Sequence, residues 1–169
     1  MNPDRDKLGG NSTAEGRKKN WWKYGRDAKA LYHAIGQGDK FHQHPKNGTG
    51  LEAELSQLLV VARVTKYFNP VIVKSDMIFH EKLVVFPSDS YAHLAFLNSS
   101  LVQSWIWKHS GTNGISLAFT PREAYSTLPF PDLDSHSGIR DLGERYEHLR
   151  RKTCSSMRIG MTIFYNGFH

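Results

Sequence analysis

Four basic residues in the strand-like and helix-opening parts of the chain have the chemistry to contact nucleic acid. Arg63 and Lys66 lie within a β-branched run, Lys74 closes the next apolar run, and Arg122 stands at the start of a predicted helix. An arginine can donate two hydrogen bonds to guanine in the major groove, whereas a lysine more often meets phosphate. Solvated surface charge is an equally common role for any single basic residue. We therefore expect a DNA-binding face formed by Arg63, Lys66, Lys74 and Arg122.

Two groups of potential metal ligands give a weaker indication. Asp132, Asp134 and His136 alternate along a polar segment and, with magnesium, would suit a small nuclease. Such an alternating cluster is more often a solvated turn. His42 and His44 are too few ligands for a tight site in a loop. We expect no bound metal, and a metal-dependent nuclease stays a minor alternative.

The chain lacks the motifs of methyl transfer and nucleotide binding. Asn69-Pro70 resembles the start of the amino-methyltransferase motif, in which an Asn or Asp, two prolines and an aromatic ring hold the target base. Val71 follows here, so the motif is not completed. No glycine-rich cofactor loop follows a predicted strand, and no P-loop pattern occurs. We expect no catalytic residues and no cofactor bound by this chain.

Size and composition favour one compact domain with a basic surface. The chain has 169 residues, of which 39% are hydrophobic, so a sizeable core can form. Lys and Arg number 22 against 16 Asp and Glu, which gives a net charge of +6. That excess suits a polyanionic partner, although many proteins without one are mildly basic.

Cysteine usage and the polar N-terminus favour the cytoplasm. Cys154 is the only cysteine, so neither an internal disulfide nor a cysteine-based metal site can form. Residues 1–20 are polar and charged, unlike a signal peptide, and no run approaches the ~20 apolar residues of a membrane span. We therefore expect a cytoplasmic protein without a membrane partner.

The spacing of apolar residues predicts an α+β fold. Residues 21–35 repeat apolar side chains at helical steps, and the predicted helix ends at Gly36. A polar loop follows at 36–50, and β-branched runs bounded by turns then predict strands at 58–67, 71–73, 77–79 and 82–86. We expect a small antiparallel or mixed sheet flanked by helices, with a C-terminal helical extension.

Helices and turns dominate the predicted second half. Helical spacing covers residues 91–109 with a break at 98–100, and glycines at 111–114 predict a turn before a short strand at 115–119. Thr120-Pro-Arg-Glu123 has the pattern of a helix start, with Thr at the N-cap, Pro next and Glu closing a capping box. Residues 137–157 predict an amphipathic helix whose apolar face carries Ile139, Leu142, Tyr146 and Leu149.

An ordered series of motifs runs from Ala62 to the last residue. Its members are Ala62-Arg-Val-Thr-Lys66, Lys82-Leu-Val-Val-Phe86, Leu94-Ala-Phe-Leu-Asn-Ser-Ser100 followed by Trp105, Phe119-Thr-Pro121, Leu128-Pro-Phe-Pro131 and Gly160-Met-Thr-Ile-Phe-Tyr-Asn-Gly-Phe-His169. With Arg17 and Trp21-Trp22 before it, the series resembles the target-recognition region of type IIG restriction–modification enzymes and of BREX-type phage-defence adenine methyltransferases.

The resemblance implies a module that reads a short DNA sequence for an N6-adenine DNA methyltransferase, which in some members is fused to a nuclease. The family's catalytic motifs lie upstream of this region, so S-adenosylmethionine would belong to the implied parent enzyme. The implied partners are double-stranded DNA and a methyltransferase domain in cis or in trans. On this basis we expect a flexible lead-in at residues 1–20, the recognition domain at 21–133, and the truncated start of a helical segment at 134–169.

A protein-binding domain is the main alternative. In that hypothesis the aromatic residues and the final amphipathic helix dock on a partner subunit. Salt separates the two functions, because DNA binding weakens steeply with ionic strength and an apolar interface does not.

Overall fold

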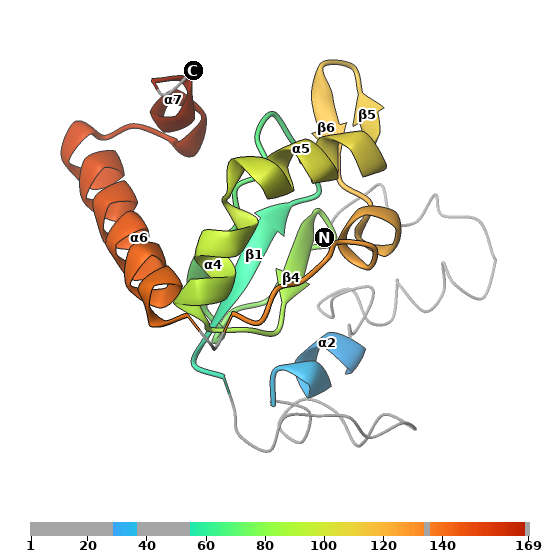
Figure 1. Ribbon diagram of the computed structural model, residues 1–169, viewed down its shortest axis with the longest axis horizontal. Helices are drawn as coiled ribbons and strands as arrows, with labels where there is room; N and C mark the ends of the chain where they lie inside the picture. The colour runs from blue at the N-terminus through green and yellow to red at the C-terminus, as the bar shows by residue number, and fades with distance from the viewer. Residues whose placement is uncertain (1–28, 37–54, 134–135, 168–169) are drawn as a thin grey trace, which may run out of the picture.

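The computed structural model describes residues 29–36, 55–133 and 136–167, which form an α+β fold (Figure 1). The predicted fold class is confirmed, with the strands divided between two small antiparallel sheets. None of the described helices is both long and apolar enough to cross a membrane. The predicted lead-in, the Trp21-Trp22 helix start and residues 37–50 of the polar loop lie outside the described residues.

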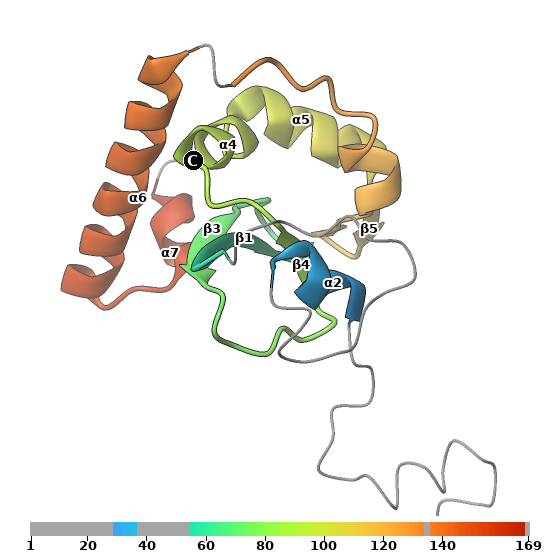
Figure 2. The same ribbon diagram turned by 90° about the horizontal axis from the view of Figure 1, so that it is seen from below.

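β1 (Gln57–Ala62) is the central strand of the first sheet, between β3 (Val71–Lys74) and β4 (Leu83–Phe86). Both faces of β1 are covered, which explains its uninterrupted apolar sequence. Figure 2 shows α4 (Tyr91–Leu97) and α5 (Ser100–His109) on one side of the sheet and α2 (Lys29–Ala34) on the other. Alternate residues of β1 therefore enter two separate hydrophobic clusters, one beneath each set of helices.

The second sheet is joined to the first by a bend at Arg63. Its strands lie in the order β2 (Val64–Thr65), β6 (Ser116–Ala118) and β5 (Gly111–Asn113). The predicted single strand at 58–67 is wrong, because the Arg63 N–H donates to the Lys82 carbonyl while the Arg63 carbonyl accepts from the Phe119 N–H, each at 2.7 Å. One residue thus pairs with both sheets, and the chain turns between them.

Two further segments differ from their predicted structure. Residues 77–79 form a loop instead of a strand, and both edges of β1 are already occupied by β3 and β4. In that loop Met77 and Ile78 are exposed, whereas Phe79 is buried. Conversely, the predicted turn at 111–114 supplies strand β5, which pairs with β6 in a hairpin.

The break predicted at residues 98–100 separates α4 from α5. Ser90 caps the first helix and Ser99 the second, with hydroxyls that accept from the backbone N–H of His93 and Val102, each at 3.3 Å. The Asn98 carboxamide donates to the Pro70 carbonyl at 3.1 Å. The new cap at the break allows both helices to place apolar side chains on the same face of the first sheet.

The C-terminal helix α6 (Ser137–Met157) has the predicted bounds but does not bury the predicted face. Gly143 and Glu147 are buried, whereas Leu142 and Leu149 are 61% and 54% exposed. The two leucines of the predicted apolar face therefore point to the surface instead of the core.

Gly143 explains this orientation of α6. A Cβ atom at this position would lie 2.0 Å from the Tyr91 carbonyl oxygen and 3.3 Å from the Ala95 Cβ atom. The backbone of α6 therefore approaches the backbone of α4 more closely than any side chain would allow. The two leucines lie outside this contact.

A buried carboxylate holds the same face of α6 one turn after Gly143. The Glu147 Oε1 atom accepts from Arg150 Nη2 at 2.5 Å and from Arg151 Nε at 2.6 Å. Arg151 also donates from Nη2 to the Ile72 carbonyl at 2.6 Å. Because Ile72 belongs to β3, this network ties α6 to the edge of the first sheet.

The short helix α7 (Met161–Asn166) packs beside α6. Phe164 is buried there, and the Tyr165 hydroxyl is hydrogen-bonded to the Tyr146 hydroxyl of α6. Burial raises the pKa of Tyr146 to about 12. The Arg150 guanidinium donates to the Met161 sulfur at 3.0 Å, so the buried network reaches α7 as well.

Gly143→Ala is expected to lower the free energy of unfolding by about 1–3 kcal/mol, the range for overpacked contacts. Alanine alone would favour a helix, so the loss comes from the clash with the Tyr91 carbonyl. Gly138→Ala on the same helix is the matched control, since a Cβ atom there meets nothing within 4 Å. Urea denaturation measures both, and a Gly143→Ala protein as stable as wild type would contradict the close approach.

Glu147→Gln is expected to lower the free energy of unfolding by about 3–5 kcal/mol, because it leaves two arginines without their carboxylate. Glu144→Gln removes the same charge from an exposed position of the same helix and should change stability by less than about 1 kcal/mol. If urea denaturation gives equal losses for the two variants, the buried pair does not hold α6 in place.

Candidate nucleic-acid interface

A groove opens where the two sheets meet. It has a volume of about 800 Å³ and is lined by Ala62, Arg63, Val64, Glu81, Lys82, Leu83 and Asn113. Ala62 pairs with Leu83 in the first sheet, and the chain then bends into the second. Two basic residues, an asparagine and a glutamate therefore line one open space.

Arg63 and Lys82 are neighbours because the backbone pairs them. Both side chains are exposed. Within the described part of the chain, no ion pair engages either side chain. Their charges are therefore available to an anion outside the fold.

Arg122 lies near the same end of the molecule, in η2 (Pro121–Tyr125), a single wide helical turn. Phe119, three residues earlier, donates to the Arg63 carbonyl. Pro121 starts the helix as predicted, but the capping box does not form. The Thr120 hydroxyl makes no cap bond and is buried without a hydrogen-bond partner among the described residues.

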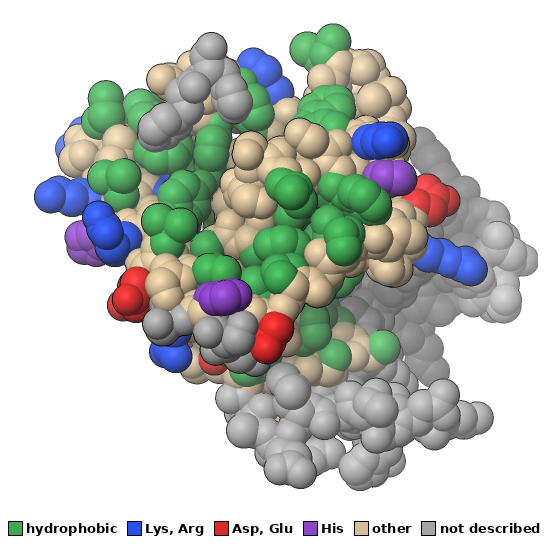
Figure 3. Space-filling view, viewed as in Figure 1, with side chains coloured by type: hydrophobic (Ala, Val, Ile, Leu, Met, Phe, Trp, Pro, Cys, Tyr) green, Lys and Arg blue, Asp and Glu red, His purple; other side chains and the backbone are tan. Residues whose placement is uncertain are grey.

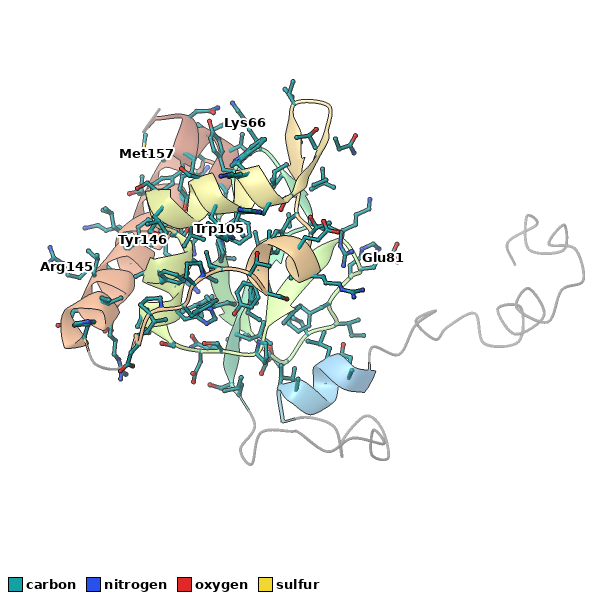
Figure 4. All side chains as sticks on the ribbon, turned by 45° about the vertical axis from the view of Figure 1, so that its right-hand side comes forward. Lys66, Glu81, Trp105, Arg145, Tyr146 and Met157 are labelled. Carbon is teal, nitrogen blue, oxygen red and sulfur yellow. The ribbon has the colours of Figure 1, made fainter. Side chains whose placement is uncertain are left out.

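Lys66 is engaged by α7 and lies away from the groove. Its ammonium donates to Asn166 Oδ1 at 2.9 Å and lies 5.2 Å from the centroid of the Tyr67 ring. The Tyr67 hydroxyl donates to the same oxygen at 2.8 Å. Figure 4 shows Lys66 and the groove residue Glu81 at different edges of the molecule.

Lys74 lies at the far end of the first sheet. It pairs with Gln57 at the beginning of β1, whereas Arg63 follows the end of that strand. The strand between these positions is about 20 Å long. Of the four predicted site residues, the structure brings Arg63 and Arg122 to one end and leaves Lys74 at the other.

The groove adds three polar residues that are not among the predicted site residues, Glu81, Lys82 and Asn113. Lys82 begins a predicted strand and carries no local sign of a site. Asn113 falls in the predicted turn at 111–114, and Asn113-Gly114 is a typical hairpin dipeptide. In a typical Asn-Gly hairpin both residues lie inside the turn, whereas here Asn113 ends β5 opposite Ser116, so the dipeptide alone would not have placed Asn113 on a strand.

An aromatic cluster supports η2 and the segment that carries Arg122. The Tyr125 ring lies 4.9 Å from the Phe86 ring and 5.2 Å from the Phe130 ring, centroid to centroid. Its hydroxyl lies 3.2 Å from Nε2 of His93. Burial lowers the pKa of His93 from 6.5 to about 4 and raises the pKa of Tyr125. His93 is therefore neutral in the folded protein near neutral pH.

The metal hypotheses concern residues that are only partly described. Among the described residues, no three His, Cys, Asp or Glu side chains form a group that could hold a metal ion. Asp132 and His136 are described, whereas Asp134, His42 and His44 lie outside the described residues.

Acid is expected to destabilise the fold through His93. The pKa of this side chain is 6.5 in the unfolded chain and about 4 in the folded protein. Between these two pH values His93 is protonated in the unfolded chain but neutral in the folded protein. The free energy of unfolding therefore falls as the pH falls. The stabilisation is complete above the unfolded pKa, and its full loss amounts to roughly 3 kcal/mol.

His93→Gln tests this expectation, because glutamine can still hydrogen-bond to Tyr125 but gains no proton. The free energy of unfolding, from urea denaturation, is compared for wild type and variant between about pH 7 and pH 4. The free energy of unfolding of wild type minus that of the variant should fall by roughly 3 kcal/mol over this range. Other titrating groups contribute equally to both proteins and cancel in this difference. A difference that does not change with pH would refute the role of His93.

The chain was compared with protein families, characterised proteins and solved structures. None of the three comparisons found a match.

Proposed function

We propose that the chain is a sequence-specific DNA recognition module of an N6-adenine DNA methyltransferase, active in restriction–modification or phage defence. The observation that carries this proposal is the groove in which Arg63, Lys82 and Asn113 line one open space. The motif series from Ala62 to His169 supports the connection to a methyltransferase, and the net charge of +6 supports a polyanionic partner.

The groove side chains match the hydrogen-bonding pattern of base edges. The Arg63 guanidinium can donate to O6 and N7 of guanine, and the Asn113 carboxamide can pair with N6 and N7 of adenine. Glu81 can accept from N4 of cytosine. A surface that bound only phosphate would gain nothing from this carboxylate, so its presence fits base reading. Lys82 and Arg122 then fix the register on the phosphates.

Catalysis and S-adenosylmethionine belong, in this proposal, to a methyltransferase domain in cis or in trans. Methylation of adenine in a duplex requires that the base be flipped out, which costs a few kcal/mol. Contacts made by the recognition module offset that cost and select the site. The chain itself then needs no cofactor and no catalytic residue, and it works in the cytoplasm with the DNA.

Exposed apolar side chains on the C-terminal helices favour a second candidate, a protein-interaction module that docks on a partner subunit. Leu142 and Leu149 on α6 and Ile163 on α7 are exposed. Figure 3 shows hydrophobic side chains on the face that includes α6. Larger exposed apolar patches mark protein interfaces. Binding to such a partner would persist in high salt, whereas DNA binding would not.

Replacing Arg63, Lys82 and Arg122 together by alanine is expected to weaken binding to a long duplex of mixed sequence. The slope of log affinity against log salt concentration should become shallower by about 2, because the two phosphate contacts of Lys82 and Arg122 each contribute about 0.9. Gel shifts at several salt concentrations measure both quantities.

The charge-matched control replaces Arg140, Arg145 and Lys152 on α6 by alanine. All three are exposed and lie outside the groove. This control should keep the wild-type slope. Equal effects of the two triple variants would place the DNA elsewhere, and a wild-type protein that binds no DNA would refute the proposed function.

A further inference from the structure

The hairpin of β5 and β6 ends in an isoleucine. Asn113 lies opposite Ser116, so Gly114 and Ile115 form a two-residue turn. Gly114 has a φ of +60°, whereas the φ of Ile115 is not positive. This is the pattern of a type II′ turn, which has glycine at its first central position. Small polar residues are usual at the second position, where this chain has Ile115.

Folding does not account for the Ile115 side chain. It is 89% exposed, the highest value among the large hydrophobic residues that the structure describes. A Cβ atom added at Gly111 or Gly114 would meet nothing within 4 Å, so the hairpin is not packed against another element there. Figure 1 shows the hairpin projecting from the body of the molecule. An apolar side chain in this position gains free energy only when a partner covers it.

The surroundings of the turn indicate what that partner is. Asn113, two residues before Ile115, lines the groove with Arg63 and Lys82. Thr112 and Ser116 on the hairpin are polar. A protein interface would require a contiguous apolar patch of roughly a few hundred Å². Ile115 and the groove residue Val64, which is 49% exposed, are apolar side chains set among cations and a carboxamide. This combination fits a nucleic acid, whose bases are apolar on their faces and surrounded by phosphates.

We propose that Ile115 is a wedge that inserts between two stacked base pairs when the groove binds DNA. This inference rests on the proposed recognition function and adds a means of deforming the duplex. Apolar residues that insert at a base step unstack it and kink the helix. A step opened beside the target would also loosen the adenine that a methyltransferase must extract.

Relaxation of a closed circular plasmid by topoisomerase tests the wedge, because insertion between base pairs unwinds DNA and changes the linking number that remains after relaxation. A plasmid offers many sequences, so no target has to be chosen. The variant is Ile115→Ser in the full chain. Ile163→Ser on α7 is the matched control, since that isoleucine is also exposed, at 60%. Gel shifts on the same plasmid measure DNA binding by each protein.

Wild type and Ile163→Ser should shift the topoisomer distribution, and Ile115→Ser should lose the shift. The affinity of Ile115→Ser should stay within about tenfold of wild type, because phosphate contacts supply much of the binding free energy. Equal shifts for all three proteins, or wild-type binding without a shift, would overturn the wedge and leave the recognition function standing. Absence of wild-type DNA binding would overturn both.

A duplex with a single mismatch gives a second measurement, because a mismatched step costs less to unstack. Wild type should bind this duplex more tightly than its fully paired counterpart, whereas Ile115→Ser should bind the two equally. The same preference in both proteins would refute the wedge even if Ile115→Ser binds the plasmid poorly.

Discussion

The peptide groups of Arg63 hydrogen-bond to different sheets, and the whole groove end of the molecule is arranged around that division. The N–H extends the pairing of the first sheet through Lys82, and the carbonyl begins the second through Phe119. Polar backbone groups inside a fold must be paired, so the chain is held in this bend by atoms that every residue type except proline possesses. The Arg63 side chain takes no part in it. The fold and the proposed function therefore use different atoms of one residue, and the side chain can be chosen for its ligand alone.

The elements that the sequence predicted correctly are those whose ends are determined locally. Ser90 and Ser99 cap their own helices, and the break between α4 and α5 could be predicted from that short polar segment. Two of the errors involve partners far along the chain, whereas the capping box at Thr120 failed locally. Nothing within residues 58–67 reveals that the Arg63 carbonyl will pair with Phe119, so the bend was not predicted. Likewise, residues 77–79 have a strand composition, but β1 has no free edge for them.

The candidate site shows the same contrast between local signals and long-range pairing. Basic residues can be chosen one by one from a sequence, but their grouping depends on long-range pairing. Arg63 and Arg122 reach the same end because Phe119 pairs with Arg63, whereas the antiparallel register places Lys74 beside the start of β1. Lys66 has a carboxamide partner from a helix that no periodicity predicted. Asn113-Gly114 does indicate a hairpin locally, but it does not indicate that Asn113 ends a strand and lines the groove.

Gly143 determines which face of α6 is turned towards α4. A helix usually turns its most apolar stripe inward, and the leucines of α6 would favour a different rotation from the one observed. The missing side chain at position 143 instead allows close contact between the backbones of α6 and α4, with the Tyr91 carbonyl directly against it. Because the orientation of α6 depends on a glycine, it does not depend on which side chains the exposed face of the helix carries. That face can accumulate apolar, polar or charged residues without any change in the fold, so the C-terminal surface is free to evolve with whatever lies against it.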